Sequence, residues 1–311
     1  MAARRSFCGL TVLAICCLTI QAPTLTAQTG AGNIQGVVRD PSSAVIAGAK
    51  VSITHVQTAR QQETTTNEVG FYLIPSVQVG QYKISVQAAG MQTWEGELVL
   101  QVGQTAVIDP QLKVGATITE VTVVGDVTPL VTTAAPTLGN VVERARLEQL
   151  PLNGRFIQTI IQASTPGLEG SSSSPRVYGL RPTSMEFLQD GAVLTNRDTG
   201  EFSGRPPGLD TVEEFKVETN NSSAKMNRPA TTLLVTRAGS NDIHGAVFET
   251  HRNNAFGLAR ARQDYYDKPP HLVRNEFGAS VGAPVYLPKI YNGKNRTFFF
   301  VAYEAYRNLS A

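Results

Sequence analysis

Residues 176–191, RVYGLRPTSMEFLQDG, carry most of the information about how this chain folds. Gly179 and Gly191 can adopt positive φ angles that are costly for other residues, and Arg181-Pro182 stiffens a bend between them. The pattern therefore predicts two short strands joined by a tight turn, with the second strand ending at Asp190-Gly191. No spacing of catalytic residues occurs within this stretch.

Further motifs flank this stretch in a fixed order. They are LPLNGR at 150–155, Pro166-Gly167, DTVEEFKV at 210–217 and GSNDIHG at 239–245. Together with residues 176–191 they resemble the plug domain and first barrel strands of TonB-dependent outer-membrane transporters, in particular the Oar-like branch. The plug core of that family has Arg-Gly where this chain has Tyr178-Gly179. The resemblance covers nearly all of the chain after residue 30.

The resemblance implies a role in transport, with no chemistry of its own and with neither cofactor nor metal. It implies a chain in the cell outer membrane, in contact with membrane lipid and with a TonB-like energy-coupling protein. The solute is left unassigned, with carbohydrate and peptide as candidate classes. The residues that match the plug signature are Asn153, Gly154, Arg155, Gly179, Arg181, Asp190 and Gly191.

The composition favours turn-rich β structure. The chain has 311 residues, more than one ordinary domain, with 17% charged residues and 27 glycines. The formal net charge is only +2, and a nearly neutral chain lacks the basic surface that nucleic-acid binding requires. Nucleic acid is therefore excluded as a partner.

The first residues have the pattern of a signal peptide. Arg4 and Arg5 precede an apolar run at 7–20, which has about the length of a signal-peptide core and is shorter than the ~20 residues of a membrane-spanning helix. We therefore expect a signal peptide at 1–27, cleavage after Ala27 and export of the rest. A lipoprotein signal at 13–16 is the alternative, although a bulky isoleucine stands where a small residue is preferred.

The three cysteines, Cys8, Cys16 and Cys17, all lie within this N-terminal segment. After cleavage the chain would contain no thiol, so we expect neither a disulfide nor a thiolate metal site. Its domains would then depend on buried apolar core.

Residues 32–113 contain short β-prone runs at intervals of about ten residues, which predict a small transthyretin-like or Ig-like β-sandwich. The runs are 34–38, 50–55, 61–66, 71–74, 82–88, 97–101 and 105–112. The motifs TNEVGFY at 66–72, VGQY at 79–82 and AGM at 89–91 resemble the carboxypeptidase regulatory-like domain, which has a carbohydrate-binding-like fold. Met91 stands where that family usually has Phe.

The residues of this module do not favour peptidase activity. A zinc carboxypeptidase needs His-x-x-Glu and a distant histidine to hold the metal. None of the histidines has Glu at that spacing; they are His55, His244, His251 and His271. Trp94 could stack on a sugar ring, but a single tryptophan in a small sandwich is more commonly a core or edge residue.

Residues 114–137 are predicted to be a linker between two domains. The stretch ITEVTVVG at 118–125 is rich in β-branched residues, and a Thr/Ala/Pro-rich tail follows it. Transporters of the family carry a short TonB box just before the plug, and a segment of this kind can add as a strand to a partner's sheet. The candidate box is Ile118, Thr119, Glu120, Val121, Thr122, Val123 and Val124. The alternative is an eighth strand of the sandwich.

Residues 138–237 mix helix and strand, as an α+β plug domain would. Asn153 is a candidate N-cap for a helix with an apolar stripe. The stripe consists of Phe156, Ile157, Ile160 and Ile161. Asp210 and Glu213 have the spacing of a capping box for a single helical turn.

Carboxylate pairs in the plug region are interpreted as solvated turns and caps rather than as acid–base pairs. The pairs are Glu213 with Glu214 and Glu186 with Asp190. Where family members have a glycine run, this chain has AKMNRPATT at 224–232, so we expect that loop to differ in shape and a closing strand to follow at 233–237.

Residues 238–311 contain three segments long enough to cross an outer membrane as antiparallel barrel strands. The segments are 244–252, 275–285 and 296–307. In the last segment the face with Phe299, Val301, Tyr303 and Ala305 is expected to meet lipid, and the face with Glu304 is expected to meet the lumen.

The middle segment contains GASVG at 278–282, which satisfies the pattern Gly-x-Ser-x-Gly. A hydrolase elbow needs a sharp strand-to-helix turn at the serine, whereas the apolar alternation here runs straight through Ser280. We therefore interpret these as small residues in a barrel wall, and we expect no enzyme.

Three strands cannot close a barrel, because outer-membrane barrels need at least eight and the family has about twenty-two. We therefore expect the sequence to be the N-terminal portion of a transporter. Its plug and periplasmic sandwich would gate the energised uptake of a bulky solute. The alternative is a secreted or surface β-sandwich protein for carbohydrate binding or adhesion, which should lack the 150–155 and 239–245 motifs.

Overall fold

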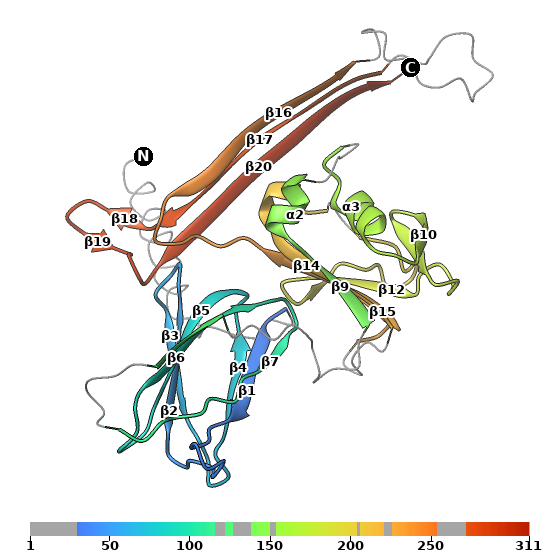
Figure 1. Cartoon of the computed structure of the whole chain (residues 1–311). Coiled ribbons are helices and arrows are strands. Elements are labelled where there is room, and N and C mark those ends of the chain that lie inside the picture. Colours follow the sequence, from blue (N-terminus) through green and yellow to red (C-terminus); the bar gives the residue numbers. More distant parts are fainter. Residues whose placement is uncertain are drawn as a thin grey trace, which may run out of the picture.

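The computed structural model describes residues 30–115, 122–126, 138–149, 154–203, 206–220, 226–253 and 272–310. The predicted signal peptide at 1–27 lies outside these residues. Figure 1 shows three bodies in chain order: a two-sheet sandwich, a mixed region with helices, and a slanted sheet of three long strands. The chain is mainly β, as predicted. No helix in the described part has the length and apolar character needed to span a membrane.

The first body is a β-sandwich whose strands lie close to the seven predicted runs. They are β1 (Gly32–Val37), β2 (Lys50–His55), β3 (Gln61–Thr65), β4 (Phe71–Val77), β5 (Gly80–Gln87), β6 (Trp94–Leu100) and β7 (Thr105–Val107). One sheet has the order β4-β1-β7, and the other contains β3-β2-β5-β6. Strands of this body alternate as half-buried strands should: β2 buries Val51 and Ile53 and exposes Lys50.

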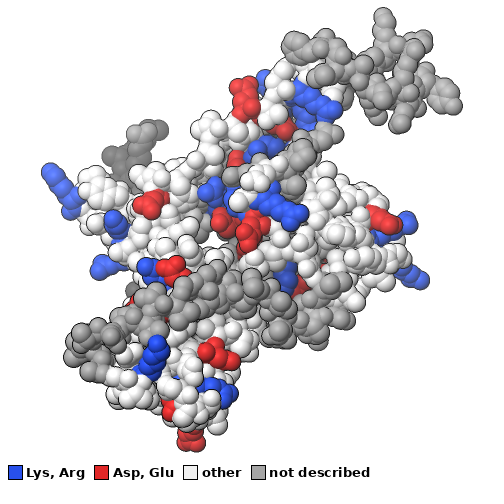
Figure 2. Space-filling model, in the orientation of Figure 1, with Lys and Arg blue, Asp and Glu red and all other residues white. Residues whose placement is uncertain are grey.

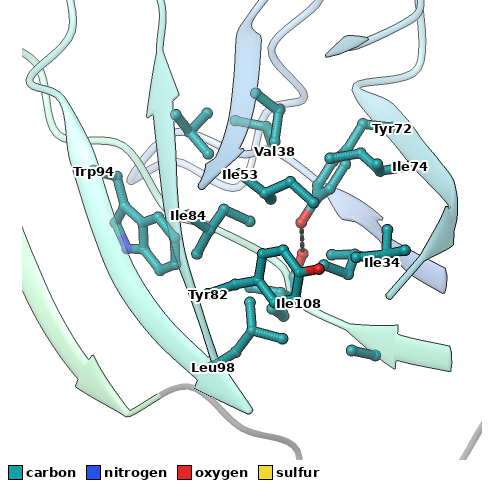
Figure 3. Packing of buried hydrophobic residues seen from close by; sticks show 14 of the residues in the cluster. Ile34, Val38, Ile53, Tyr72, Ile74, Tyr82, Ile84, Trp94, Leu98 and Ile108 are labelled. Atoms are coloured by element: carbon teal, nitrogen blue, oxygen red, sulfur yellow. Dashed lines mark hydrogen bonds between the residues drawn. The ribbon is translucent and has the colours of Figure 1, made fainter. Parts of the chain in front are cut away.

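Figure 3 shows the apolar core between the two sheets. Ile34, Ile53 and Ile84 are fully buried, and each side chain of this size contributes ~1.5–3 kcal/mol on burial. The hydroxyl of Tyr72 donates to the carbonyl of Ile108 at 2.9 Å, which satisfies a polar group inside the core. Trp94 is 6% exposed and packs in the same cluster. The interpretation of Trp94 as a core residue is therefore confirmed.

An edge strand, β8 (Thr122–Asp126), extends the larger sheet to the order β3-β2-β5-β6-β8. It pairs in parallel with β6, with Thr122 opposite Trp94 and Val124 opposite Gly96, and the register shifts after Gly96. This arrangement agrees with the alternative in which part of the 118–125 stretch is a further strand of the sandwich. Residues 118–121 of the candidate TonB box lie outside the described residues.

The second body is a five-stranded mixed sheet with two helices and a small hairpin. Its elements are β9 (Leu138–Glu143), α2 (Arg144–Gln149), α3 (Ile157–Ser164), β10 (Leu168–Ser171), β11 (Ser174–Val177), β12 (Met185–Gln189), β13 (Ala192–Val193), η1 (Leu209–Thr211), β14 (Val212–Asn220) and β15 (Ala230–Thr236). The sheet order is β13-β12-β15-β14-β9. Helix α3 buries three residues of the predicted stripe, Ile157, Ile160 and Ile161.

Residues 176–191 contain the two predicted strands, but these belong to different sheets. β11 pairs with β10, whereas β12 pairs with β13 and β15. Gly179 and Gly191 have φ angles of 75° and 89°, as the predicted turns require. The turn between β11 and β12 therefore leads the chain from the β10–β11 hairpin into the five-stranded sheet.

Two predicted helix caps are wrong. The N-cap position of α3 is Phe156, which has extended backbone and no side-chain cap, and Asn153 lies outside the described residues. The short turn η1 starts after Gly208, and Asp210 lies within it without capping its N-terminus. The Asp210 carboxylate instead pairs with Arg144 and Arg155, because guanidinium groups are stronger partners for a carboxylate than backbone N–H groups.

The third body is an antiparallel sheet of β16 (His244–Asn253), β17 (Leu272–Pro284) and β20 (Phe298–Ser310), the longest ribbons in Figure 1. Phe299, Val301 and Tyr303 of β20 are exposed, and Glu304 turns toward Arg155 of the second body. The predicted alternation is thus confirmed from Phe299 to Glu304, whereas Ala305 is half-buried and lines a cavity with Glu304. A small hairpin of β18 (Tyr286–Leu287) and β19 (Tyr291–Asn292) was not predicted, because two-residue strands carry no periodicity.

The Gly-x-Ser-x-Gly match lies inside regular sheet. Ser280 pairs with Ala246 on one side and Ala302 on the other, and the pairing continues without a turn on both sides of it. The interpretation as barrel wall, rather than as a nucleophile elbow, agrees with this geometry.

Candidate functional site

The second body, which we call the plug region after the resemblance described above, meets the barrel strands at Arg155. Its Nε donates to Oε1 of Glu304 on β20 at 2.7 Å, and its Nη2 lies 2.9 Å from Oδ2 of Asp210 in η1. The contact with Asp210 is an ion pair without hydrogen-bond geometry. One guanidinium therefore joins the plug to the barrel, and we refer to Arg155, Asp210 and Glu304 as the latch.

Asp210 is held from a second direction by Arg144 in α2. Arg144 Nη2 donates to Asp210 Oδ1 at 2.6 Å, and Nη1 donates to the carbonyl of Leu209 at 2.7 Å. The Asp210 side chain is only 9% exposed. Burying an ion is costly unless opposite charges compensate it, so the two arginines together allow this carboxylate to lie inside the plug.

Aromatic rings from both bodies pack around the latch. The guanidinium carbon of Arg155 lies 3.7 Å from the centroid of the Phe248 ring on β16, and that of Arg274 on β17 lies 4.9 Å from the Phe156 ring of the plug. The rings of Phe156 and Tyr306 meet edge to face at 5.8 Å. Cation–π contacts contribute roughly 0.5–2 kcal/mol each. Through these contacts the plug touches all three barrel strands.

Two glycines permit this close approach. Gly154 has a φ angle of 98°, and a Cβ atom there would lie 2.6 Å from Nη2 of Arg274. A Cβ atom on Gly208 would collide with the carboxylate of Glu304. Gly154 belongs to a motif that the sequence analysis identified. Gly208 was not predicted to matter, because it follows two prolines in a stretch typical of an ordinary turn.

A cavity of about 750 Å³ lies beside the latch, between the plug and the inner face of β20. Its lining includes Arg155, Phe156, Asp210, Glu276, Glu304 and Tyr306. Because one wall belongs to the plug and the other to the barrel, any movement of the plug away from β20 would change the size of this cavity.

The other signature residues that the structure describes lie elsewhere in the plug region. Asp190, at the end of β12, accepts hydrogen bonds from N and Oγ1 of Thr236 at 3.0 and 2.7 Å, which ties that strand end to β15. Gly179 and Arg181 lie in the exposed turn after β11. The signature residues that the structure brings to the barrel are Gly154 and Arg155.

A second contact region joins the sandwich to the plug sheet. The turn after β6 buries Val102 completely beside Leu188 and Leu233. The Val102 N–H donates a short hydrogen bond to Glu214 Oε1, and Gln101 Nε2 donates to Glu143 Oε1 at 2.6 Å. The sandwich is therefore fastened to β9 and β14 by polar contacts around one apolar side chain.

Two carboxylates that the sequence led us to regard as solvated are buried. Glu214 is 7% exposed, and burial raises its pKa to about 8, an effect that the Val102 N–H opposes and that Glu143 and Glu213 add to. Glu186 is 3% exposed and accepts hydrogen bonds from N and Nδ2 of Asn227. The interpretation of these carboxylates as solvated is wrong, because both lie on inner strands of the five-stranded sheet. The side chains on both faces of these strands are buried.

The motif at 239–245 links the sandwich to the turn between β17 and β20. The N–H of Asn241 donates to the carbonyl of Gln57 at 3.0 Å. The Asn241 side chain exchanges two hydrogen bonds of 2.7 Å with Asn295. One asparagine at the entrance to the barrel thus contacts both neighbouring parts of the molecule.

Two family models match this chain. The carboxypeptidase regulatory-like domain matches residues 33–113, and the outer membrane beta barrel domain matches residues 235–311. The TonB-dependent transporter Oar of Myxococcus xanthus is 20% identical over 289 residues, which cover 88% of this chain and 27% of that protein. The chain is an Oar-like member of the TonB-dependent transporter family. It spans about a quarter of the length of this curated relative.

This similarity confirms the predicted place in the outer membrane, and it confirms that the chain is not an enzyme, because the relative is a transporter. Among solved structures, the ferric enterobactin receptor of Pseudomonas aeruginosa is 17% identical, with 50% of this chain and 23% of that chain covered and a TM-score of 0.36. Catechol 1,2-dioxygenase of Acinetobacter radioresistens is 11% identical, with 30% and 58% covered and a TM-score of 0.23. Both scores are too low for these structures to bear on the function of the Oar-like chain.

Proposed function

We propose that this chain forms the periplasmic module and the gate of a transporter that takes up a bulky solute at the expense of TonB-coupled energy. The observation that carries this proposal is the latch, in which Arg155 of the plug is held by Asp210 and by Glu304 of the barrel. A gate needs contacts that are specific yet separable. Ion pairs meet this need, because their strength depends on the exclusion of water and falls once water enters.

The proposed gate divides the chain into five parts. They are a signal peptide at 1–27, a periplasmic sandwich at 32–113, a linker at 114–137, a plug at 138–237 and barrel strands at 238–311. The separate cores of the sandwich and of the plug sheet support this division.

A TonB-like protein is the proposed partner, with the candidate box at 118–124 as its binding segment. Support comes from the place of this segment, which precedes β9, an edge strand of the plug sheet. β9 pairs with β14 alone within that sheet, beginning at Leu138 opposite Asn220. Tension on the box would therefore load the pairs of β9 one after another, and β9 leads directly into α2 and Arg144 of the latch network.

The rival function, a surface protein for carbohydrate binding or adhesion, has less support. Trp94 is the side chain that could have stacked on a sugar, and it lies in the sandwich core. A free-standing adhesive module would also have no use for a latch between a plug and barrel strands.

A disulfide across the latch tests the gate. An ideal Cβ atom on Gly208 lies 3.3 Å from Cβ of Glu304, close to the ~3.5–4.5 Å of a disulfide. In the complete transporter, the oxidised Gly208→Cys/Glu304→Cys variant should fail to accumulate labelled oligopeptides or oligosaccharides that the wild type takes up. Reduction should restore accumulation.

The matched control is Glu304→Cys alone, which lacks a disulfide partner and should respond to neither oxidant nor reductant. Wild-type accumulation should stop when the proton gradient is collapsed or the TonB-like protein is deleted. Accumulation that persists in the oxidised double variant, or without the gradient, would contradict the proposed gate.

A further inference from the structure

The hairpin between β17 and β20, residues 285–297, is not used by the proposed gate. Its base is closed by a hydrogen bond from the Val285 N–H to the Thr297 carbonyl at 2.9 Å, and its arms are β18 and β19. The hydroxyls of Tyr291 and Thr297 lie 2.6 Å apart. The hairpin is therefore well ordered, and Figure 1 shows that it projects sideways from the end of the three-stranded sheet.

Large apolar side chains of this hairpin face solvent. Tyr286 is 65% exposed, Leu287 50% and Ile290 84%. Single exposed apolar residues are ordinary, but a cluster of them on one projecting element marks an interaction surface. The backbone hydrogen bonds of the hairpin show that this exposure is a feature of its folded form.

The hairpin directly continues β17 and β20, whose paired ends are Pro284 and Phe298. Val281 on β17 and Val301 on β20 are exposed on the face of these strands that meets lipid, and Ile243, just before β16, is 81% exposed at the same end of the sheet as the hairpin. Where membrane strands leave the hydrocarbon, aromatic rings settle at the level of the lipid headgroups. The position of the hairpin therefore corresponds to the membrane interface.

The charge of the hairpin is entirely positive. Residues 285–297 include Lys289, Lys294 and Arg296 and no acidic residue. Within the described ranges, none of the three cations forms an ion pair. Figure 2 shows Lys and Arg side chains standing out at the side of the molecule where Figure 1 places β18 and β19. Exposed apolar groups beside unpaired cations suit an anionic lipid surface.

We propose that the hairpin binds the anionic phospholipid headgroups of the leaflet on the plug side of the membrane. Lys289, Lys294 and Arg296 contact the phosphates, while Tyr286 and Ile290 enter the interface. The continuity with the lipid-facing strands favours lipid over a soluble partner as the occupant. This role anchors and orients the barrel entrance, and it does not depend on the proposed gate.

The test compares charge-neutralised variants of the full chain in vesicle flotation. Vesicles of phosphatidylcholine alone are compared with vesicles that contain phosphatidylglycerol. The wild type should prefer the anionic vesicles, and Lys289→Gln/Lys294→Gln/Arg296→Gln should lose that preference by about a hundredfold, because each of the three cations near an anionic surface contributes roughly fivefold. The control Lys50→Gln/Lys83→Gln/Lys113→Gln removes three charges from the sandwich and should keep the preference.

An unchanged preference in the hairpin variant, or an equal loss in the control, would overturn the proposal. A second readout is Ile290→Trp with brominated phosphatidylglycerol, which should quench the new tryptophan, since native Trp94 is shielded in the sandwich core. A lack of quenching would also overturn it. If the wild type self-associates in neutral detergent and Tyr286→Ser/Ile290→Ser abolishes the association, the hairpin is instead an interface between copies of the chain.

Discussion

At the scale of single residues, the contacts of Arg155 show why the plug signature requires arginine at this position. Its guanidinium pairs with Asp210 and Glu304 through different nitrogens, and its face covers the Phe248 ring. A planar group with donors in several directions can do all three, whereas a lysine ammonium is a point charge without a flat face. The motif thus encodes a geometry and not only a positive charge.

Glu214 gives the junction between sandwich and plug a predicted dependence on pH. Its pKa is raised from 4.5 to about 8 by burial, so between these values the folded chain keeps a proton that the unfolded chain has released. The contribution of Glu214 to the free energy of unfolding should therefore be greatest below pH 4.5 and should be lost as pH rises from 4.5 to about 8. The slope from this one group is at most about 1.4 kcal/mol per pH unit.

The measurement is the urea midpoint of the chain across this pH range. Glu214→Gln keeps an oxygen for the Val102 N–H but cannot ionise, so it should remove this part of the slope. Glu201→Gln, at an exposed position, is the control and should leave the slope unchanged. Parallel curves for Glu214→Gln and the wild type would show that Glu214 does not bind the extra proton.

At the scale of elements, alternation and turn residues were sufficient to predict the sandwich and barrel strands. The faces of β20 follow directly from the alternation around Val301. No such alternation marks β14, because nearly all of its side chains are buried, and the burial of Glu214 was therefore not predicted. Only part of the latch could be predicted from the sequence. Arg155 belongs to a recognisable motif, whereas Glu304 was predicted only to face the lumen. Their pairing could not be predicted, because two residues 149 positions apart leave no local sequence pattern.

Two neighbouring substitutions in β20 test the assignment of its faces. Val301 is 59% exposed on the lipid side, while Ala302 lines the cavity beside the plug. Val301→Lys should destabilise the membrane-inserted transporter by about 2–4 kcal/mol, because a lysine near the middle of the bilayer is poorly solvated. Ala302→Lys should be tolerated in an aqueous lumen. Urea unfolding from vesicles gives both values, and equal losses would show that the two faces are not distinct.

At the scale of the whole molecule, three bodies are fastened at separate points. The latch joins plug to barrel, Val102 and Glu214 join sandwich to plug, and Asn241 joins the sandwich to the barrel entrance. In the proposed division of the chain, the linker with the candidate TonB box connects the sandwich to β9, and these two parts are already joined through Val102 and Glu214. A pull on this linker would therefore act on these junctions before it reaches the barrel wall.

The substitution Val123→Pro tests whether this linker is a binding segment or a structural strand. Val123 lies in β8 opposite Glu95 of β6, and β8 adds four pairs to the edge of the sandwich. Proline removes the N–H of this residue and fixes its φ angle, so it should abolish binding of a purified TonB C-terminal domain, which would add to the segment as a strand. Melting of the sandwich should change little, since its core lies between the sheets of residues 32–113.

Thr133→Pro, in the tail that already contains prolines, is the matched control and should leave binding intact. A lower melting temperature for Val123→Pro, together with no TonB binding by the wild type, would assign the segment to the sandwich and place energy coupling elsewhere in the chain.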